Sequence, residues 1–261
     1  MRLLLLAAVL WPSTLLAQSP FDGAWVVKLD SVHVSNRPED YLLQNGTYEC
    51  ATCVPRLDVK ADAKDYPVAG SPYFSHISVR VLDNNSVEIT EKKSGKIVYS
   101  ETDTVSPDGN TLTQKISDSA APSGQPVTAE ETYTRLKQGP AGSNEVSGLW
   151  RAESIKNISE NGITVTYHSI PGGLQALNPN GEGYSAKFDG KDYPIKGDPA
   201  HDTVALKRIN ARTIEETDKQ EGAAHYKLRL VVSPAGRTLR VTETDYERGT
   251  RVTYTMEKRA Q

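Results

Sequence analysis

The sequence predicts an all-β protein made of two tandem antiparallel meander β-barrels, with about eight strands each. Three observations support this. Apolar and polar residues alternate in short runs along the whole chain, turn-forming residues separate the runs at regular intervals, and the second half of the chain repeats the first. We therefore expect a signal peptide at residues 1–17, one barrel at 18–140 and a second barrel at 141–261.

The N-terminus has the pattern of a secretory signal. A basic Arg2 precedes the apolar run Leu3–Leu10, and a small residue, Ala17, ends the segment. The run is too short for a membrane span, which needs about 20 apolar residues, and no later segment approaches that length. No cysteine follows the expected cut to accept a lipid. These features indicate a periplasmic or secreted protein without a membrane span.

The two cysteines, Cys50 and Cys53, are expected to form a small disulfide in an oxidising compartment. A thioredoxin-type redox pair would require a helix beside the cysteines, and Gly46 and Pro55 argue against one. Zinc would require two further ligands, and the five histidines are scattered singly along the chain. We expect no metal site and no cofactor.

The internal repeat is visible at an offset of 127 residues, from Lys60 to Lys187, over more than fifty positions. The segment 64–67 reads Lys-Asp-Tyr-Pro, and so does 191–194. Val-Ser-Pro recurs at 105–107 and 232–234. The chain therefore contains two copies of one unit.

Each copy begins with a tryptophan. Gly23-Ala24-Trp25 matches Gly148-Leu149-Trp150 with a slightly different offset. Between the copies, residues 137–144 are rich in Gly, Pro and Ser and show no apolar periodicity. This stretch is expected to be the linker, with the boundary near Ala141.

Strands and turns account for the chain inside each copy. Runs such as Tyr226-Leu228-Leu230-Val232 alternate with polar residues, which is the pattern of a half-buried strand. Asp189-Gly190 and residues 106–109, Ser-Pro-Asp-Gly, have the composition of tight turns. The runs favour hairpins that follow one another in a meander, and an eight-stranded barrel is wide enough for filling side chains or one small ligand.

The Gly-x-Trp at the start of each copy resembles the opening signature of the calycins, the lipocalins and fatty-acid-binding proteins. The resemblance implies a lipocalin-like barrel in which the Trp seals one end beneath a basic residue of the last strand. Arg135 in the first copy and Lys258 or Arg259 in the second are candidates for that residue. The segments Tyr-x-Cys-x-x-Cys-x-Pro at 48–55 and Lys-Asp-x-Pro at 64–67 and 191–194 make the chain similar, over nearly its whole length, to a group of uncharacterised exported bacterial proteins. That similarity implies no particular activity.

Candidate ligand-binding residues are Tyr66 and Tyr193, each before a proline, together with Trp25 and Trp150. A tyrosine offers an apolar face with a polar tip, so the tyrosines are expected either at a ligand mouth or packed at a turn. The repeated acidic pairs are expected to hold turns through their side chains. We identify no catalytic residue, since no histidine recurs in both copies and no Gly-x-Ser-x-Gly motif is present.

Three classes of function remain open. The first is a non-enzymatic binding module for a small apolar or amphipathic ligand. The second is a structural or interaction protein of the cell envelope with filled barrels and no small ligand, whose protein partner the sequence does not identify. The third is an enzyme acting in a barrel mouth, which the sequence favours least. The near-balanced charge gives no field that would attract nucleic acid.

Overall fold

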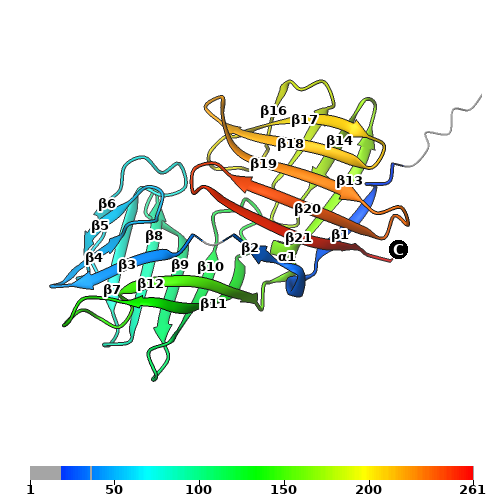
Figure 1. Ribbon diagram of the computed structural model, residues 1–261. Coiled ribbons are helices and arrows are strands. Elements are labelled where there is room, and N and C mark those ends of the chain that lie inside the picture. The colour runs from blue at the N-terminus through cyan, green and yellow to red at the C-terminus, as the bar shows by residue number, and fades with distance from the viewer. Residues whose placement is uncertain (1–18, 36, 261) are drawn as a thin grey trace, which may run out of the picture.

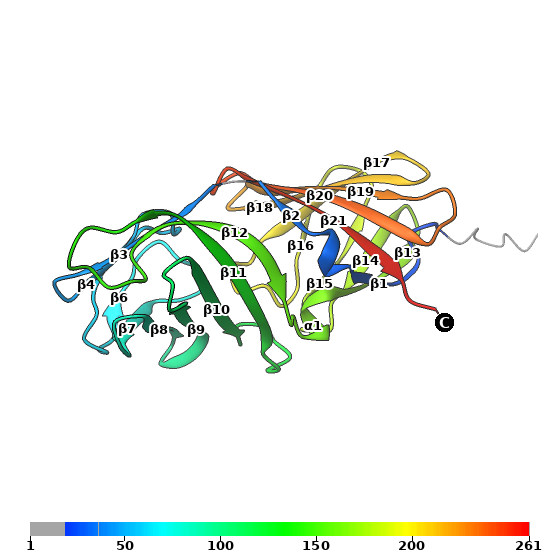
Figure 2. The same cartoon turned by 60° about the horizontal axis from the view of Figure 1, so that its bottom comes forward.

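The computed structural model describes residues 19–35 and 37–260. The expected signal peptide at 1–17 lies outside the described residues. Nearly all regular structure is β, arranged as two antiparallel, almost closed barrels that lie next to each other (Figures 1 and 2). The short helices η1 (Leu29–Ser31) and α1 (Glu160–Ile163) lie between strands. The predicted fold class is confirmed.

The first barrel is a ten-stranded sheet in which every neighbouring pair is antiparallel. A bridge between Asp62 and Arg80 brings its two ends together. In spatial order its strands are β5 (Leu57–Lys60), β4 (Thr47–Cys50), β3 (Glu39–Gln44), β12 (Gly148–Lys156), β11 (Val127–Gln138), β10 (Thr111–Asp118), β9 (Lys96–Val105), β8 (Ser86–Lys93), β7 (His76–Val81) and β6 (Tyr66–Pro67).

The second barrel repeats this architecture, and a bridge between Gly183 and Lys196 brings its ends together. The two-residue strand β2 (His33–Val34) adds to it beside β21. In spatial order its strands are β15 (Gly183–Lys187), β14 (Gly173–Leu177), β13 (Thr164–Ile170), β1 (Gly23–Val27), β21 (Thr250–Lys258), β20 (Thr238–Asp245), β19 (Ala223–Val232), β18 (Thr213–Gln220), β17 (Thr203–Asn210) and β16 (Asp192–Pro194).

Ten strands per barrel exceed the expected eight or so. The additional strands are short, as β5 with four residues and β6 with two illustrate. A run of two to four residues cannot display an alternating pattern, because that pattern needs several repeats of the two-residue period.

The first strand of each sequence repeat lies in the barrel of the other repeat. β1, with Trp25, pairs with β13 and β21 in the second barrel. β12, with Trp150, pairs with β11 and β3 in the first barrel. In Figure 1, β1 lies beside β13 and β21, two strands that come much later in the sequence and belong to the second repeat. The two halves of the chain have exchanged equivalent strands.

This exchange moves the connections between the barrels. The segment 137–144, expected to be the linker, lies at the junction of β11 and β12, which are neighbours in the first barrel. The chain passes between barrels instead from β1 to β3 and from β12 to β13. A Gly/Pro/Ser-rich composition is typical of surface loops in general. It does not distinguish a turn within one barrel from a linker between two barrels. The sheets therefore do not follow the expected division at residues 140 and 141.

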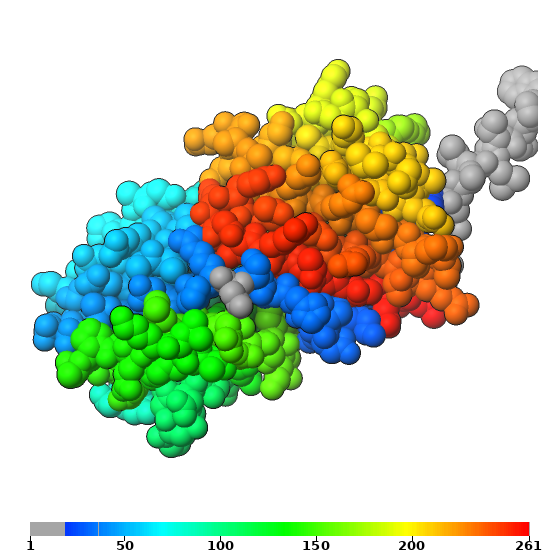
Figure 3. Space-filling view, viewed as in Figure 1, coloured from blue at the N-terminus to red at the C-terminus, as the bar shows by residue number. Residues whose placement is uncertain are grey.

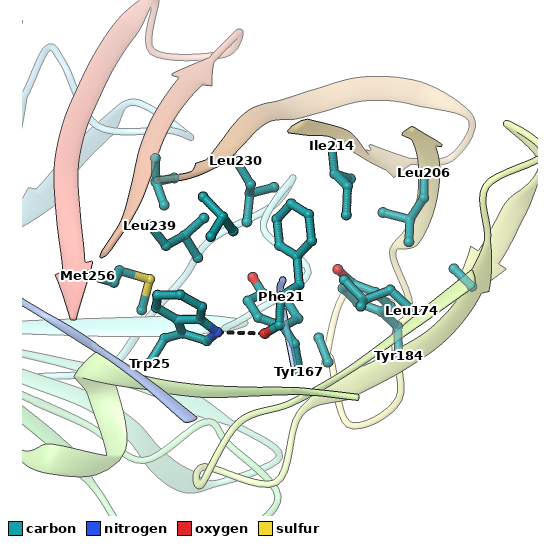
Figure 4. Packing of buried hydrophobic residues seen from close by; sticks show 14 of the residues in the cluster. Phe21, Trp25, Tyr167, Leu174, Tyr184, Leu206, Ile214, Leu230, Leu239 and Met256 are labelled. Atoms are coloured by element: carbon teal, nitrogen blue, oxygen red, sulfur yellow. Dashed lines mark hydrogen bonds between the residues drawn. The ribbon is translucent and has the colours of Figure 1, made fainter. Parts of the chain in front are cut away.

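A buried tryptophan closes one end of each barrel. Both indoles are fully buried, and each donates a hydrogen bond to a nearby carbonyl: Trp25 to Phe21 at 2.7 Å and Trp150 to Val146 at 2.8 Å. Figure 4 shows Trp25 and Phe21 among the apolar side chains of the second barrel. The core therefore sits inside the barrel, against this closed end.

A basic residue covers each tryptophan, as the calycin resemblance implies, but the pairs are crossed. The Arg135 guanidinium lies 4.1 Å from the centre of the Trp150 ring, and the Lys258 ammonium lies 5.2 Å from that of Trp25. Each basic residue thus covers the tryptophan of the other repeat. Strand exchange explains this, because the basic residues stay with their own barrels.

The opposite ends of the barrels face each other, and each is covered by a turn from its neighbour. Ser123, between β10 and β11, donates its amide to the carbonyl of Asn180 in the second barrel. In return, the turn between β20 and β21 reaches the mouth of the first barrel, where Glu247 and Arg248 line a cavity together with first-barrel residues such as Glu39. Arg37, in the connection just before β3, donates a hydrogen bond to the carbonyl of Arg248. Figure 3 shows the red surface of this turn against the first barrel. The covering is reciprocal.

Gly197 permits one of these contacts. It has a φ of +82°, and a Cβ atom built on it would lie 2.7 Å from Pro122 of the covering turn. A side chain there would therefore collide with the neighbouring barrel.

Within residues 19–35 and 37–260, no helix is long and apolar enough to cross a bilayer.

Candidate ligand-binding site

A cavity of about 490 Å³ occupies the mouth of the first barrel, under the covering turn of the second. Its volume lies in the range typical of small-molecule sites. Carboxyl groups and tyrosines dominate the polar part of its lining. They are Glu39, Glu91, Glu101, Asp118, Glu131, Asp245 and Glu247, and Tyr41, Tyr48, Tyr73, Tyr99, Tyr133 and Tyr226.

Strand β9 carries the central polar residues. Tyr99 and Glu101 alternate along it on the inner face and line the cavity, and Asp103 follows on the same face of the strand. The Tyr99 hydroxyl donates a hydrogen bond to Glu101. Burial and the charge of Glu101 both raise the pKa of Tyr99, so this hydroxyl remains protonated as a donor.

Two neighbouring strands complete the polar group. Gln114 on β10 donates its amide to Glu101 at 3.1 Å and to the Tyr41 hydroxyl at 3.4 Å. On β11, the Tyr133 hydroxyl donates to Glu131 at 2.5 Å. These bonds fix the tyrosine and carboxyl groups relative to one another and leave the carboxyl groups as the acceptors of the cavity.

Asp103 is fully buried, and neither of its carboxyl oxygens has a hydrogen-bond partner among the described residues. Burial, followed by the charge of Glu101, raises the pKa of Asp103 well above its usual range. Burial also raises the pKa of Glu101. Two carboxyl groups so close together cannot both ionise cheaply, so the pair retains a proton.

Glu91, on β8, extends the acidic surface toward the mouth. Burial, with the charges of Glu101 and Asp118, raises its pKa to about 7. Its charge therefore depends on conditions near neutrality. A positive charge entering the cavity would lower this pKa and stabilise the ionised carboxylate.

The second barrel contributes the basic groups of the lining, Arg248 and His225. Burial acts to lower the pKa of Arg248, but nearby Glu39, Tyr226 and Asp245 outweigh this and raise it. His225 lies with its Nδ1 3.2 Å from a Glu247 carboxylate oxygen. The mouth therefore already holds one cation, Arg248, among acidic side chains.

The predicted ligand-binding residues lie elsewhere. Tyr66 and Tyr193 each donate a 3.0 Å hydrogen bond from their hydroxyls to a turn aspartate, Asp62 and Asp189 respectively. Neither tyrosine lines the cavity, and neither do Trp25 and Trp150, which lie buried at the closed ends. These positions correspond to packing at a turn and at a barrel end.

Cys50 and Cys53 lie at disulfide distance, with Cα atoms 5.4 Å apart, and Cys53 lines the cavity. The histidines do not converge on a metal site: among the described residues, no group of three or more His, Cys, Asp or Glu side chains is placed to hold a metal ion.

The sequence contained a signal for this site. At the repeat offset, Glu101 and Asp103 of the first copy stand where the second has Leu228 and Leu230. Two acids on the inward face of a strand, where the equivalent strand of the other repeat has leucines, indicate a polar interior.

Neither a search of protein-family models nor one of curated proteins finds a match to this chain.

Proposed function

We propose that this protein is an exported, non-enzymatic binding protein that holds a small amphipathic molecule in the cavity of its first barrel. The observation that carries the proposal is the cavity of about 490 Å³ itself, which combines aromatic faces, aliphatic side chains and carboxyl groups. Export is supported by the signal-like residues 1–17 and by the paired cysteines.

The mixed lining supports an amphipathic ligand rather than a purely apolar one. Ile89, Val98 and Ile116 supply aliphatic surface beside the tyrosines. A wholly apolar ligand would cover Glu101 and Glu131 without giving them a polar partner, and that costs free energy. A molecule with an apolar body and a polar end satisfies both parts of the wall.

Native mass spectrometry of residues 18–261, purified from the periplasm without denaturation, tests this proposal. We expect a mass excess over the denatured chain that corresponds to one small molecule. The cavity-filling variant Ile116→Trp should lose the excess mass. Ile97→Trp adds the same indole at an exposed site on β9 and should retain it. A clean apo mass for the wild-type chain, with no binding in a ligand screen, would instead favour an envelope interaction protein with filled barrels.

A further inference from the structure

We infer that the ligand of the first barrel is a small organic cation, an amine or quaternary ammonium with an apolar body. This inference rests on the proposed function and specifies the ligand class of that site. Four observations lead to it: the charge of the lining, its aromatic faces, the cation already held at the mouth, and the second barrel.

The lining is strongly acidic. It holds seven carboxyl groups against one arginine and one histidine. In a partly enclosed space, like charges repel more strongly than in water, so these groups need protons or an added cation. The hydroxyls of Tyr99 and Tyr133 and the amide of Gln114 satisfy only part of the demand. Behind the lining, the fully buried Asp103 adds a further carboxyl group beside Glu101 and brings no positive charge to it.

The neutral part of the wall suits an organic cation. Six tyrosines line the cavity, and the face of a tyrosine ring attracts a positive charge by about 0.5–2 kcal/mol, more when the charge is shielded from water. Ammonium groups with carbon substituents combine that charge with an apolar surface. A hydrated metal ion would leave the aromatic and aliphatic walls unused, and the described residues contain no metal-binding group.

Arg248 shows that the mouth accepts a cation. The second barrel delivers its guanidinium into the cavity, where Glu39, Tyr226 and Asp245 favour its charged form. The carboxyl groups deeper in the cavity have no such resident cation. A ligand cation would balance their negative charge, as Arg248 balances that of the carboxyl groups at the mouth.

The second barrel shows that the fold does not require the acids. Where the first barrel has Glu101, Asp103 and Gln114, the second has Leu228, Leu230 and Val241. These side chains belong to the apolar core of that barrel or pack against it. The second barrel has its own buried acid, Glu216, at a different position. The architecture therefore forms without acids at the positions of Glu101 and Asp103, and folding does not account for them.

Ligand-observed NMR titration of the full mature chain at pH 8 and low salt tests the inference. The probes are phenyltrimethylammonium and its neutral isostere, tert-butylbenzene. We expect the cation to bind at least tenfold more tightly. The double variant Glu101→Gln/Glu131→Gln should weaken cation binding at least tenfold and leave the isostere unchanged. Glu216→Gln, which removes a buried carboxylate from the second barrel, should affect neither probe.

The outcomes separate the two proposals. Equal binding of both probes, abolished by Ile116→Trp, would overturn the cation inference and leave the binding function intact. A dissociation constant above about 1 mM for the cation would also overturn the inference. Native mass spectrometry would then decide whether the cavity holds another ligand. Melting temperatures of all variants verify that each one folds.

Discussion

The two barrels have the same strand order but different interiors. The second is filled mainly by apolar side chains, including Leu230, Val241 and Met256. The first has Asp103, Gln114 and Tyr133 at the equivalent places, and a large cavity opens above them. The difference shows that the barrel is specified by its strands, turns and closed end, so the side chains nearer the mouth were free to diverge.

The second barrel is not wholly apolar. Glu216 on β18 accepts a 2.6 Å hydrogen bond from the Tyr184 hydroxyl, and Asp218 lies two residues further along. A cavity of about 410 Å³ lies beside Glu216, lined by aliphatic residues together with polar ones such as Asn178 and Asn180. Burial also raises the pKa of Glu243 on β20, so the buried acids of the second barrel come from β18 and β20. The acids that the first barrel supplies to its cavity come from five strands, β3, β8, β9, β10 and β11. The comparison can be tested at matched positions.

Removing the tryptophans should have the largest effect. Trp150→Ala and Trp25→Ala should each cost about 3–5 kcal/mol, because each deletes a fully buried indole. Strand exchange predicts where the damage falls. Hydrogen exchange should show lost protection in β8–β10 for Trp150→Ala and in β18–β20 for Trp25→Ala. Damage confined to the repeat that carries the mutated residue would contradict the exchanged arrangement.

The pH dependence of stability comes next. Glu91 and Asp218 occupy equivalent positions, and burial raises their pKa values to about 7 and about 9. Both groups bind a proton more tightly when folded, so their contribution to stability is fully present at low pH and is lost as the pH rises through these values. The loss should be at most about 3.5 kcal/mol for Glu91, since its pKa rises from 4.5 to about 7 and each pKa unit is worth about 1.4 kcal/mol.

Calorimetry at pH 5, 7 and 9 would separate the two groups. Glu91→Gln should reduce the loss between pH 5 and 7 and have little effect above 7. Asp218→Asn should reduce it between pH 7 and 9 as well. A melting temperature that rises from pH 5 to 9 would contradict the raised pKa values.

Replacing Asp103 with leucine makes the first barrel resemble the second at that position. Asp103→Leu should stabilise the protein by about 1–3 kcal/mol, because it removes a buried carboxyl group without a hydrogen-bond partner. Leu230→Asp, the matched change, should destabilise it. Urea unfolding measures both. A loss of stability in Asp103→Leu would mean that Asp103 has a structural role.

Opening the disulfide should have the smallest effect. The bond closes a loop of only four residues, so it removes little entropy from the unfolded chain, and the cost of its loss should not exceed about 2 kcal/mol. Cys50 pairs with Tyr41 in the first barrel, and at the same place in the second barrel Ala176 pairs with Tyr167. The second barrel therefore closes without this link. Melting curves with and without a reductant measure the change, and a large drop would contradict this account.

The sequence was sufficient for the fold class, the repeat and many of the turns. The turn at 106–109, for example, closes with a 2.8 Å hydrogen bond from Gly109 to Ser106. The exchange of β1 and β12 could not be predicted, because both strands begin with the same Gly-x-Trp and therefore fit either barrel equally well. The cavity could not be predicted either, since its volume depends on how two barrel mouths meet.

The exchanged strand has a consequence for the order in which the chain is made. β1 is among the first segments to leave the ribosome, and its neighbour β21 is the last strand to be synthesised. The second barrel therefore cannot close until β21 has been made. Trp25 is synthesised early, but Lys258, which covers it, is added only when almost the entire chain is complete.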